Sequence, residues 1–203
     1  TKPISLKSIE GIVQINHVHQ ENLRQDPNDK WDKLGQYFII GKGAASGLDE
    51  VFVITKELAE ENKIEKGLLV PIAEDDTLDA YYIEHRNRYL IATQRGIDIS
   101  KSPNAKAYLN KNKAVLEKRY AVQNEGVGWY EIVRFNKELF EGDGGLIYCY
   151  YRSAKSKFAY SSELYCTLTT TFAIRARPSC NLALHYILAL LNSRYLEINY
   201  FQQ

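Results

Sequence analysis

Methionine is absent from this sequence of 203 residues, and cysteine occurs only three times. The lack of methionine predicts that the chain is an excised part of a longer protein or an incomplete sequence. The cysteines are too widely spaced for a Cys-x-x-Cys pair, so neither a zinc site nor a disulfide framework is expected. Free thiols instead indicate a reducing compartment, the cytoplasm. No apolar run approaches the roughly 18 residues of a membrane span, so we expect no membrane contact.

Net charge is also nearly absent, at +1, but the charges are unevenly distributed. Residues 1–85 carry 9 basic and 16 acidic residues. Residues 86–119 carry 9 basic and 2 acidic residues, and residues 152–177 carry 5 basic and 1 acidic. Two basic segments beside an acidic one are typical of a polyanion-binding face or of solvated helix surfaces, and charge alone does not separate the two.

Strand-like and helix-like stretches are mixed without a regular strand–helix rhythm. This mixture predicts an α+β domain with a mixed, mainly antiparallel sheet and a few packing helices, rather than a doubly wound fold. Period-two alternation and runs of β-branched and aromatic residues predict the strands. The expected strands are residues 9–20, 36–41, 48–54, 80–84, 88–93, 129–135, 145–152 and 171–177.

Helices are expected at residues 55–67, 102–123 and 181–202. Thr55 is the expected N-cap of the first, with Gly67 just after its end. The second begins with Ser102 as a cap and Pro103 in the first helical position. Its expected apolar side consists of Ala107, Tyr108, Leu109, Val115 and Leu116. The C-terminal apolar helix has one stripe, made of Leu184, Ile187, Leu188 and Leu191.

A glycine-rich stretch, GKGAASG at 41–47, separates two apolar runs. It is not a P-loop, because Leu48 and Asp49 stand where Lys and Ser/Thr are required. It is also a poor dinucleotide fingerprint, because Gly47 is one residue late and a strand is expected next. The fingerprint needs a helix there, whose N-terminus binds the pyrophosphate. We therefore expect the loop to allow close approach of another backbone, either in a tight turn or at a DNA strand.

Two weaker patterns have some features of metal sites. Asp49, Glu61 and Lys63 have the loose spacing of a metal-dependent nuclease, and His17 and His19 lie on one face of an expected strand. Glu61 and Lys63 fall in a charged helix rather than on strands, so a solvated helix surface is the favoured interpretation. We predict no metal site and no catalytic motif in this chain.

Basic and aromatic residues alternate around two of the expected strands. Basic side chains neutralise phosphates, and arginine also reads base edges. The alternative is aromatic packing beneath the stems of Lys and Arg. The basic residues concerned are Arg86, Arg88 and Arg95 around the strand at 88–93, and Arg152, Lys155 and Lys157 after the strand at 145–152.

Five stretches occur in a characteristic order: GKGAASGLDEVFVI, RYLIATQRGIDISKSPNAKAYLNKNKAVLEKRYAVQ, GWYEI, YYRSAKSKFAYSS and YILALLNSRYL. The ordered set resembles the TaqI-like specificity domain, the target-recognition domain of adenine-specific DNA methyltransferases. It is similar to those of type IIG restriction-modification enzymes, and the resemblance covers roughly residues 30–200. The resemblance implies a domain that docks in the DNA major groove opposite a separate catalytic domain. The S-adenosylmethionine site and the Asn/Asp-Pro-Pro-Tyr loop of that catalytic domain are not found here, so this chain alone is not expected to methylate DNA.

The resemblance places the loop at 41–47 near DNA and gives Trp129 and Tyr130 a structural role. Phosphate contacts are expected from basic residues, and base contacts from a subset of polar and arginine side chains. The candidate phosphate contacts are Lys42, Arg86, Arg88, Lys101, Lys155 and Lys157. The other candidate DNA contacts are Gly43, Ser46, Gly47, Arg95, Arg152 and Arg175.

The sequence therefore predicts a DNA target-recognition domain at residues 1–180 of a restriction-modification enzyme. Residues 181–203 form a helix that packs on this domain or on the parent enzyme. The expected partners are double-stranded DNA and a methyltransferase catalytic domain or subunit. S-adenosylmethionine belongs to the parent enzyme, and whether magnesium does too stays open. Two alternatives stay open: a separate specificity subunit that recruits a methyltransferase, and a metal-dependent nuclease in its own right.

Overall fold

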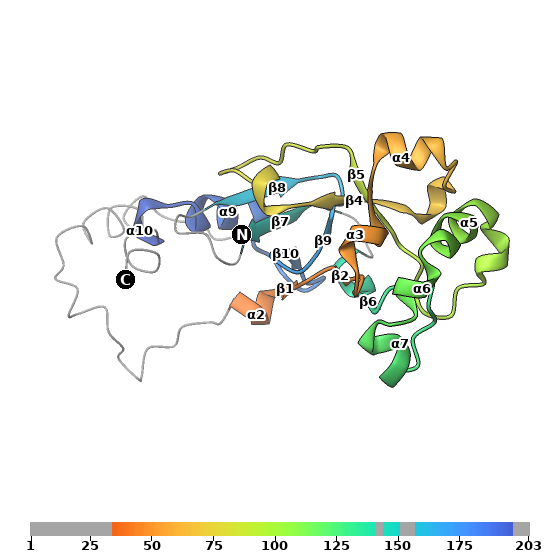
Figure 1. The fold of residues 1–203 in the computed structure, drawn as a ribbon. Coiled ribbons are helices and arrows are strands. Elements are labelled where there is room, and N and C mark those ends of the chain that lie inside the picture. The colour runs from red at the N-terminus through yellow and green to blue at the C-terminus, as the bar shows by residue number, and fades with distance from the viewer. Residues whose placement is uncertain (1–33, 141–143, 151–156, 197–203) are drawn as a thin grey trace, which may run out of the picture. The chain divides into compact units, whose positions relative to one another are not determined.

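The computed structural model describes residues 34–140, 144–150 and 157–196 of the chain (Figure 1). These residues form an α+β fold in which antiparallel strand pairs dominate, as the sequence predicts. The expected strand at residues 9–20 lies outside the described residues, as do His17, His19, Arg152 and Lys155.

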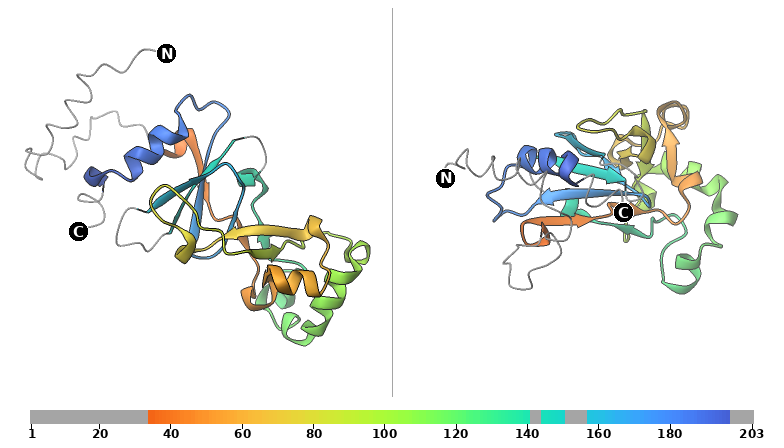
Figure 2. Two further views of the ribbon diagram at one scale, coloured as in Figure 1. Left: turned by 90° about the horizontal axis from the view of Figure 1, so that it is seen from above. Right: turned by 90° about the vertical axis from the view of Figure 1, so that its left-hand side faces the viewer.

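The first sheet has four antiparallel strands in the order β1-β10-β7-β8. They are β1 (Phe38–Gly41), β7 (Leu146–Tyr150), β8 (Phe158–Ser161) and β10 (Thr171–Ala176). Helix α9 (Leu184–Leu191) lies beside this sheet (Figure 2). Ile187 and Leu188 of α9 pack with Phe38, Ile147 and Ile174, so the apolar stripe expected on this helix contacts the sheet of its own chain.

The second sheet has the strand order β3-β5-β4-β9, in which only β4 and β9 are parallel. Its strands are β3 (Val53–Thr55), β4 (Leu69–Ala73), β5 (Arg88–Ile91) and β9 (Cys166–Thr167). Since β9 is followed by β10 of the first sheet, residues 166–176 connect the two sheets. A two-stranded ribbon joins β2 (Ala44–Ala45) to β6 (Arg134–Phe135).

Short helices complete the fold. Helices α4 (Lys56–Glu61) and α5 (Pro103–Lys111) supply Ala59, Ala105, Tyr108 and Leu109 to the largest apolar cluster, which also contains residues of the second sheet. The α-helices not yet introduced are α2 (Leu34–Tyr37), α3 (Asp49–Phe52), α6 (Lys113–Leu116), α7 (Tyr120–Asn124), α8 (Lys137–Phe140) and α10 (Arg194–Leu196). Single 3₁₀ turns lie at Lys66–Leu68, Asp75–Thr77 and Ile99–Lys101.

The glycine-rich stretch at 41–47 is a site of close backbone approach. The Gly43 amide donates to the Thr167 hydroxyl at 2.7 Å, and its carbonyl accepts from the Asn136 amide at 2.7 Å. A Cβ atom at Gly43 would lie 2.6 Å from the Phe140 ring and 2.8 Å from the Thr167 nitrogen. Gly47 has φ +78°, in the left-handed region that favours glycine. The loop therefore joins β1 to the ribbon while packing against β9.

Three expected strands are wrong in whole or in part. Residues 48–54 begin with helix α3, because Leu48 O accepts from the Val51 and Phe52 amides and acidic residues fill the first turn. Residues 80–84 make only isolated bridges, and Tyr81 has φ +77°, which a continuous strand does not allow. In residues 129–135 only β6 is strand, because the amides of Glu131 and Ile132 bond to Gly128 O and Thr93 O instead.

The glycine-rich loop leads into a helix rather than the expected strand, but this helix does not suit a nucleotide phosphate. Helix α3 has only four residues, and its first turn carries Asp49 and Glu50. Two carboxylates at a helix N-terminus repel a pyrophosphate.

The expected helices form but are shorter. Thr55 caps α4 as predicted, but Gly67 does not end it: α4 stops at Glu61, and Lys63 takes the left-handed conformation with φ +51°. The helix expected at 102–123 is divided into α5, α6 and α7. Pro103 is its first residue, as predicted, but the amides of Asn104 and Ala105 are bound by the Glu65 carboxylate rather than by Ser102.

Two residues of the expected apolar side, Ala107 and Val115, are exposed. Both precede residues that do reach the core, namely Tyr108 and Leu116. In the C-terminal segment, α9 ends at Leu191 and α10 is a single turn, so residues 184–196 form two helices rather than one.

Candidate nucleic-acid interface

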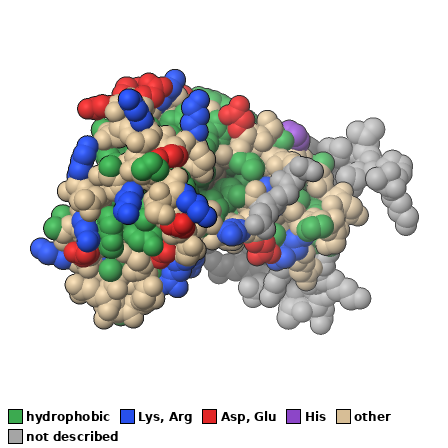
Figure 3. Space-filling model, turned by 90° about the vertical axis from the view of Figure 1, so that its right-hand side faces the viewer, with side chains coloured by type: hydrophobic (Ala, Val, Ile, Leu, Met, Phe, Trp, Pro, Cys, Tyr) green, Lys and Arg blue, Asp and Glu red, His purple; other side chains and the backbone are tan. Residues whose placement is uncertain are grey.

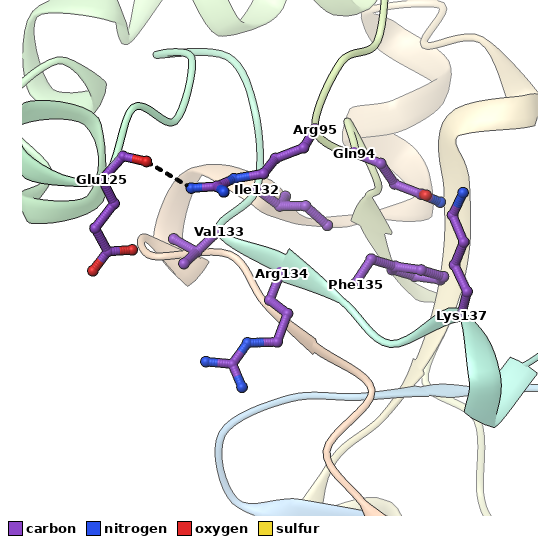
Figure 4. Close-up of a pocket in the computed structure, with 8 residues that line it drawn as sticks. All are labelled: Gln94, Arg95, Glu125, Ile132, Val133, Arg134, Phe135 and Lys137. Carbon is purple, nitrogen blue, oxygen red and sulfur yellow. Dashed lines mark hydrogen bonds between the residues drawn. The ribbon is translucent and has the colours of Figure 1, made fainter.

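A cleft of about 400 Å³ opens between three segments that are distant in sequence (Figure 4). One wall is the loop after β5, a second is the end of α7, and the third is β6 with the start of α8. Its apolar floor is provided by Ile132, Val133 and Phe135. The polar lining residues are Gln94, Arg95, Glu125, Arg134 and Lys137.

The first wall is a tight turn. The Ile97 amide donates to Gln94 O at 3.1 Å, and Gly96 has φ +80°. This places Arg95 and Gly96 at the two central positions of a type II turn, whose second central residue needs a positive φ. The residue before the turn, Thr93, is fully buried, and its hydroxyl donates to Tyr130 O at 2.5 Å.

A buried arginine and a buried carboxylate lie behind the cleft. The Glu131 carboxylate accepts from the Gly96 amide at 2.7 Å and from the Gly128 amide at 2.8 Å. Arg119 donates to the carbonyls of Ser46, Leu116, Gly128, Trp129 and Glu131. Burial lowers the pKa of the Arg119 guanidinium, and the charge of Glu131 opposes that shift. The two residues join the glycine-rich loop, the helical segment and the turn that forms the cleft wall.

The cleft is electropositive. It carries three basic side chains and the carboxylate of Glu125. Among the described residues, no carboxylate lies within 4.0 Å of the charged groups of Arg95, Arg134 or Lys137. Arg95 is oriented by one hydrogen bond, from its guanidinium to Glu125 O at 2.9 Å. Cations that gather around a concavity without ion-pair partners attract polyanions more strongly than paired ones.

Four sequence candidates are ion-paired at the protein surface. Arg86 pairs with Asp76, and Arg88 pairs with Glu74 at 2.6 Å. Lys157 lies 3.8 Å from Asp79, and Lys101 lies 3.8 Å from Asp98. Three of these carboxylates belong to the acidic stretch at 74–84, so this part of the surface is charge-compensated.

Other candidates lie in or beside the glycine-rich loop and the first sheet. Ser46 is buried, where its hydroxyl donates to Asp49 and accepts from the Leu48 amide. Arg175 is 6 % exposed, and its Nε donates to Leu139 O at 2.5 Å. Gly47 and Lys42 are exposed, and Lys42 Nζ lies 5.6 Å from the centre of the Phe172 ring. A contact between these residues and DNA stays a prediction.

Sequence reasoning missed Gln94, Arg134 and Lys137. Arg134 and Lys137 belong to residues 120–151, a segment with 2 basic and 5 acidic residues. Because its net charge is negative, a charge count does not indicate a DNA-binding surface there. The signal that could have found them is local: the spacing Arg134-Phe-Asn-Lys137 puts two cations around a half-buried aromatic ring. Their meeting with Gln94 and Arg95 depends on long-range contacts that no sequence spacing encodes.

The face that carries α5 and α6 has further basic side chains scattered among hydrophobic, acidic and uncharged ones (Figure 3). Lys106 and Lys118 are exposed there. Lys113 instead pairs with Glu117 at 3.6 Å and lies 5.2 Å from the centre of the Trp129 ring.

Acidic and thiol side chains lie at several places in the part of the chain that the structure describes. In that part, no three His, Cys, Asp or Glu side chains are grouped so as to hold a metal ion. Asp49 accepts the Ser46 hydroxyl, and Glu61 ends α4. Burial raises the pKa of the Cys149 thiol to about 11 and that of Cys166 to about 12, so both are protonated at neutral pH. None of the described helices has the length and apolarity needed to cross a membrane.

Comparisons with known proteins give a likeness in fold. No protein-family profile matches the sequence, and no curated protein matches it. Among solved structures, the type IIL restriction-modification enzyme MmeI in complex with DNA is similar, with a TM-score of 0.56 and 13 % sequence identity. The match covers 83 % of this chain but only 22 % of the MmeI chain. The chain therefore shares the fold of about one fifth of a restriction-modification enzyme.

Proposed function

We propose that this chain is a sequence-specific recognition domain for double-stranded DNA, belonging to a restriction-modification enzyme. The observation that carries the proposal is the cleft, where Arg95, Arg134 and Lys137 have no carboxylate partner among the described residues. Unpaired cations around an open concavity fit a phosphate backbone. The fold likeness to part of MmeI, a restriction-modification enzyme solved with DNA, supports the same conclusion.

We further propose that the parent is an adenine-specific methyltransferase with a TaqI-like specificity domain. The S-adenosylmethionine site of the parent lies in its catalytic domain, and the enzyme is located in the cytoplasm. The ordered motifs of the sequence support this assignment. On this proposal the chain supplies recognition, and the methyl transfer takes place in a separate catalytic domain across the duplex.

The test is the salt dependence of duplex binding. The affinity of the 203-residue chain for a fluorescent duplex of mixed sequence should fall steeply between about 50 and 200 mM salt, because bound phosphates release their counterions. The double variant Arg134→Ala/Lys137→Ala should reduce the slope of log affinity against log salt by about two units.

The matched control is Arg86→Ala/Lys101→Ala, which removes two surface cations that are already ion-paired. This control should change the slope by less than the cleft variant does. If the duplex affinity of the unmodified chain does not change with salt, the proposal is contradicted. A larger change of the slope in the control would instead assign the phosphate contacts to the surface residues predicted from the sequence.

A further inference from the structure

Two neighbouring side chains in the cleft wall retain free hydrogen-bonding capacity. Gln94 is half-buried, and its carboxamide has no hydrogen-bond partner among the described residues. Arg95 is exposed and uses one guanidinium nitrogen, Nη2, to bind Glu125 O. A glutamine amide offers a donor and an acceptor side by side, and a guanidinium offers five donors in a planar fork. Four of those five donors of Arg95 are available to a ligand.

The backbone that carries these two side chains is held on both sides. Before the turn, Thr93 O accepts from the Ile132 amide at 2.8 Å, and the Thr93 hydroxyl bonds to Tyr130 O. Within it, the Gly96 amide is held by the Glu131 carboxylate at 2.7 Å. Arg119 donates to the Glu131 carbonyl at 2.9 Å, which holds the backbone of the residue whose carboxylate binds the turn. A rigid turn fixes the direction of its side chains, which is what discrimination between similar ligands requires.

The remaining cations of the cleft differ from this pair. Arg134 and Lys137 are exposed on β6 and α8, and neither side chain makes a hydrogen bond with a described residue. In Figure 4 the Arg134 guanidinium points away from the Arg95 side chain. Long, unrestrained cations suit phosphates, which tolerate many approach directions, better than base edges.

We infer that the turn Gln94–Ile97 is the base-reading element of this domain, with Gln94 directed at adenine and Arg95 at guanine. This inference rests on the proposed DNA recognition. Gln pairs bidentately with the N6 and N7 atoms of adenine, and Arg pairs with O6 and N7 of guanine. Arg134 and Lys137 hold the backbone beside these bases. Glu131 is a positioning residue, because it fixes the turn without lining the cleft.

The test is selection from a randomised duplex pool with the full chain, followed by sequencing. The unmodified chain should enrich a short motif that contains guanine and adenine positions. Arg95→Ala should weaken the preference at one guanine position by roughly 5- to 150-fold, and Gln94→Ala should do the same at one adenine position. Lys137→Ala should lower the affinity but leave the motif unchanged.

Glu131→Gln tests the positioning role, because it keeps the size of the side chain but replaces one acceptor oxygen with an NH2 donor, which would face the amide N–H of Gly96 or Gly128. It should relax the base preferences set by Gln94 and Arg95 while leaving the salt slope unchanged. An unchanged motif in a folded but less stable Glu131→Gln variant would make this residue structural only and would overturn its positioning role.

Two results overturn the base-reading inference itself. One is that Arg95→Ala and Gln94→Ala select the same motif as the unmodified chain. The other is salt-sensitive binding of the unmodified chain with no enriched motif, which leaves DNA binding in place but removes base reading by this turn. Absence of any salt-sensitive binding would instead overturn the proposed function, so the two failures are distinguishable.

Discussion

At the scale of single residues, Arg119 determines how the loops around the cleft are arranged. Its side chain is only 7 % exposed, it stacks 4.9 Å from the centre of the Phe52 ring, and it binds five carbonyl groups. In the sequence this residue is one of nine basic residues of the segment 86–119, and it adds to the apparent DNA-binding charge. The structure gives it an interior role, because only guanidinium has enough donors for so many acceptors.

Arg119→Met should destabilise the fold by about 3–5 kcal/mol, since it leaves several buried carbonyls without donors and removes a positive charge that interacts with the buried Glu131 carboxylate. Arg119→Lys keeps the charge but has too few donors in the required directions, so an intermediate loss is expected. Urea denaturation followed by circular dichroism measures both losses. A loss below about 1 kcal/mol for Arg119→Met is typical of a surface cation and would contradict this interior role.

At the scale of elements, the side chains of α9 show which surface its apolar stripe contacts. Leu188 is 5 % exposed and packs in the cluster of Phe38, Ile147 and Ile174, whereas Tyr186 on the same helix is 43 % exposed. Leu188→Ala should therefore cost about 2–5 kcal/mol of unfolding free energy in the isolated chain. Tyr186→Ala is the matched control and should change stability by less than about 0.5 kcal/mol.

Chemical denaturation of the two α9 variants shows whether the apolar stripe of this helix stabilises the chain itself or is free to bind a catalytic partner. If both are neutral, the stripe does not contribute to the fold of this chain and is available to a catalytic partner. The division of the chain at residue 180 and the contact with a parent enzyme stay predictions.

Sequence patterns predicted the strands whose residues both favour a β conformation and pack in a sheet. Strands β5, β7 and β10 are rich in β-branched and aromatic residues and are buried or half-buried along their length, so local propensity agrees with tertiary packing there. The helix predicted at 102–123 was too long for a tertiary reason. Arg119 has an extended backbone with ψ 137°, which ends the helical run and lets its side chain reach Ser46 O.

The cleft was predictable only in part, because its walls come from three segments. Arg95 was found because it stands in a basic segment, but Gln94 has no charge and lies in an unremarkable loop. Arg134 reaches the cleft through the pairing of β6 with β2, a two-residue ribbon too short to leave a periodic pattern. Long-range pairs of this kind are decided by the packing of the whole domain.

At the scale of the whole molecule, the cleft and the apolar clusters belong to one compact unit, residues 34–203. The largest cluster contains Ile132 of the cleft floor, and Phe135 packs against it. A ligand in the cleft therefore contacts residues that are part of the core, and its binding free energy should add to the stability of the unit.

Duplex DNA should accordingly raise the midpoint of thermal unfolding of this chain. Free duplex at about 100 times its Kd stabilises a folded protein by about 2.7 kcal/mol if the unfolded chain does not bind. For a domain of 150–250 residues this corresponds to a shift of about 5–10 °C. The shift should shrink as salt is added, because the phosphate contacts weaken, and it should be largely lost in Arg134→Ala/Lys137→Ala.

Differential scanning calorimetry at low and high salt measures this shift, and heparin serves as a comparison polyanion. A shift with heparin and none with duplex would assign the cleft to another polyanion. An equal duplex-induced shift in the cleft double variant would place the bound duplex elsewhere on the molecule. A shift that depends on duplex, on low salt and on the two cleft cations links the binding free energy to the core beneath the cleft, since only contacts made in the folded state can raise the unfolding midpoint.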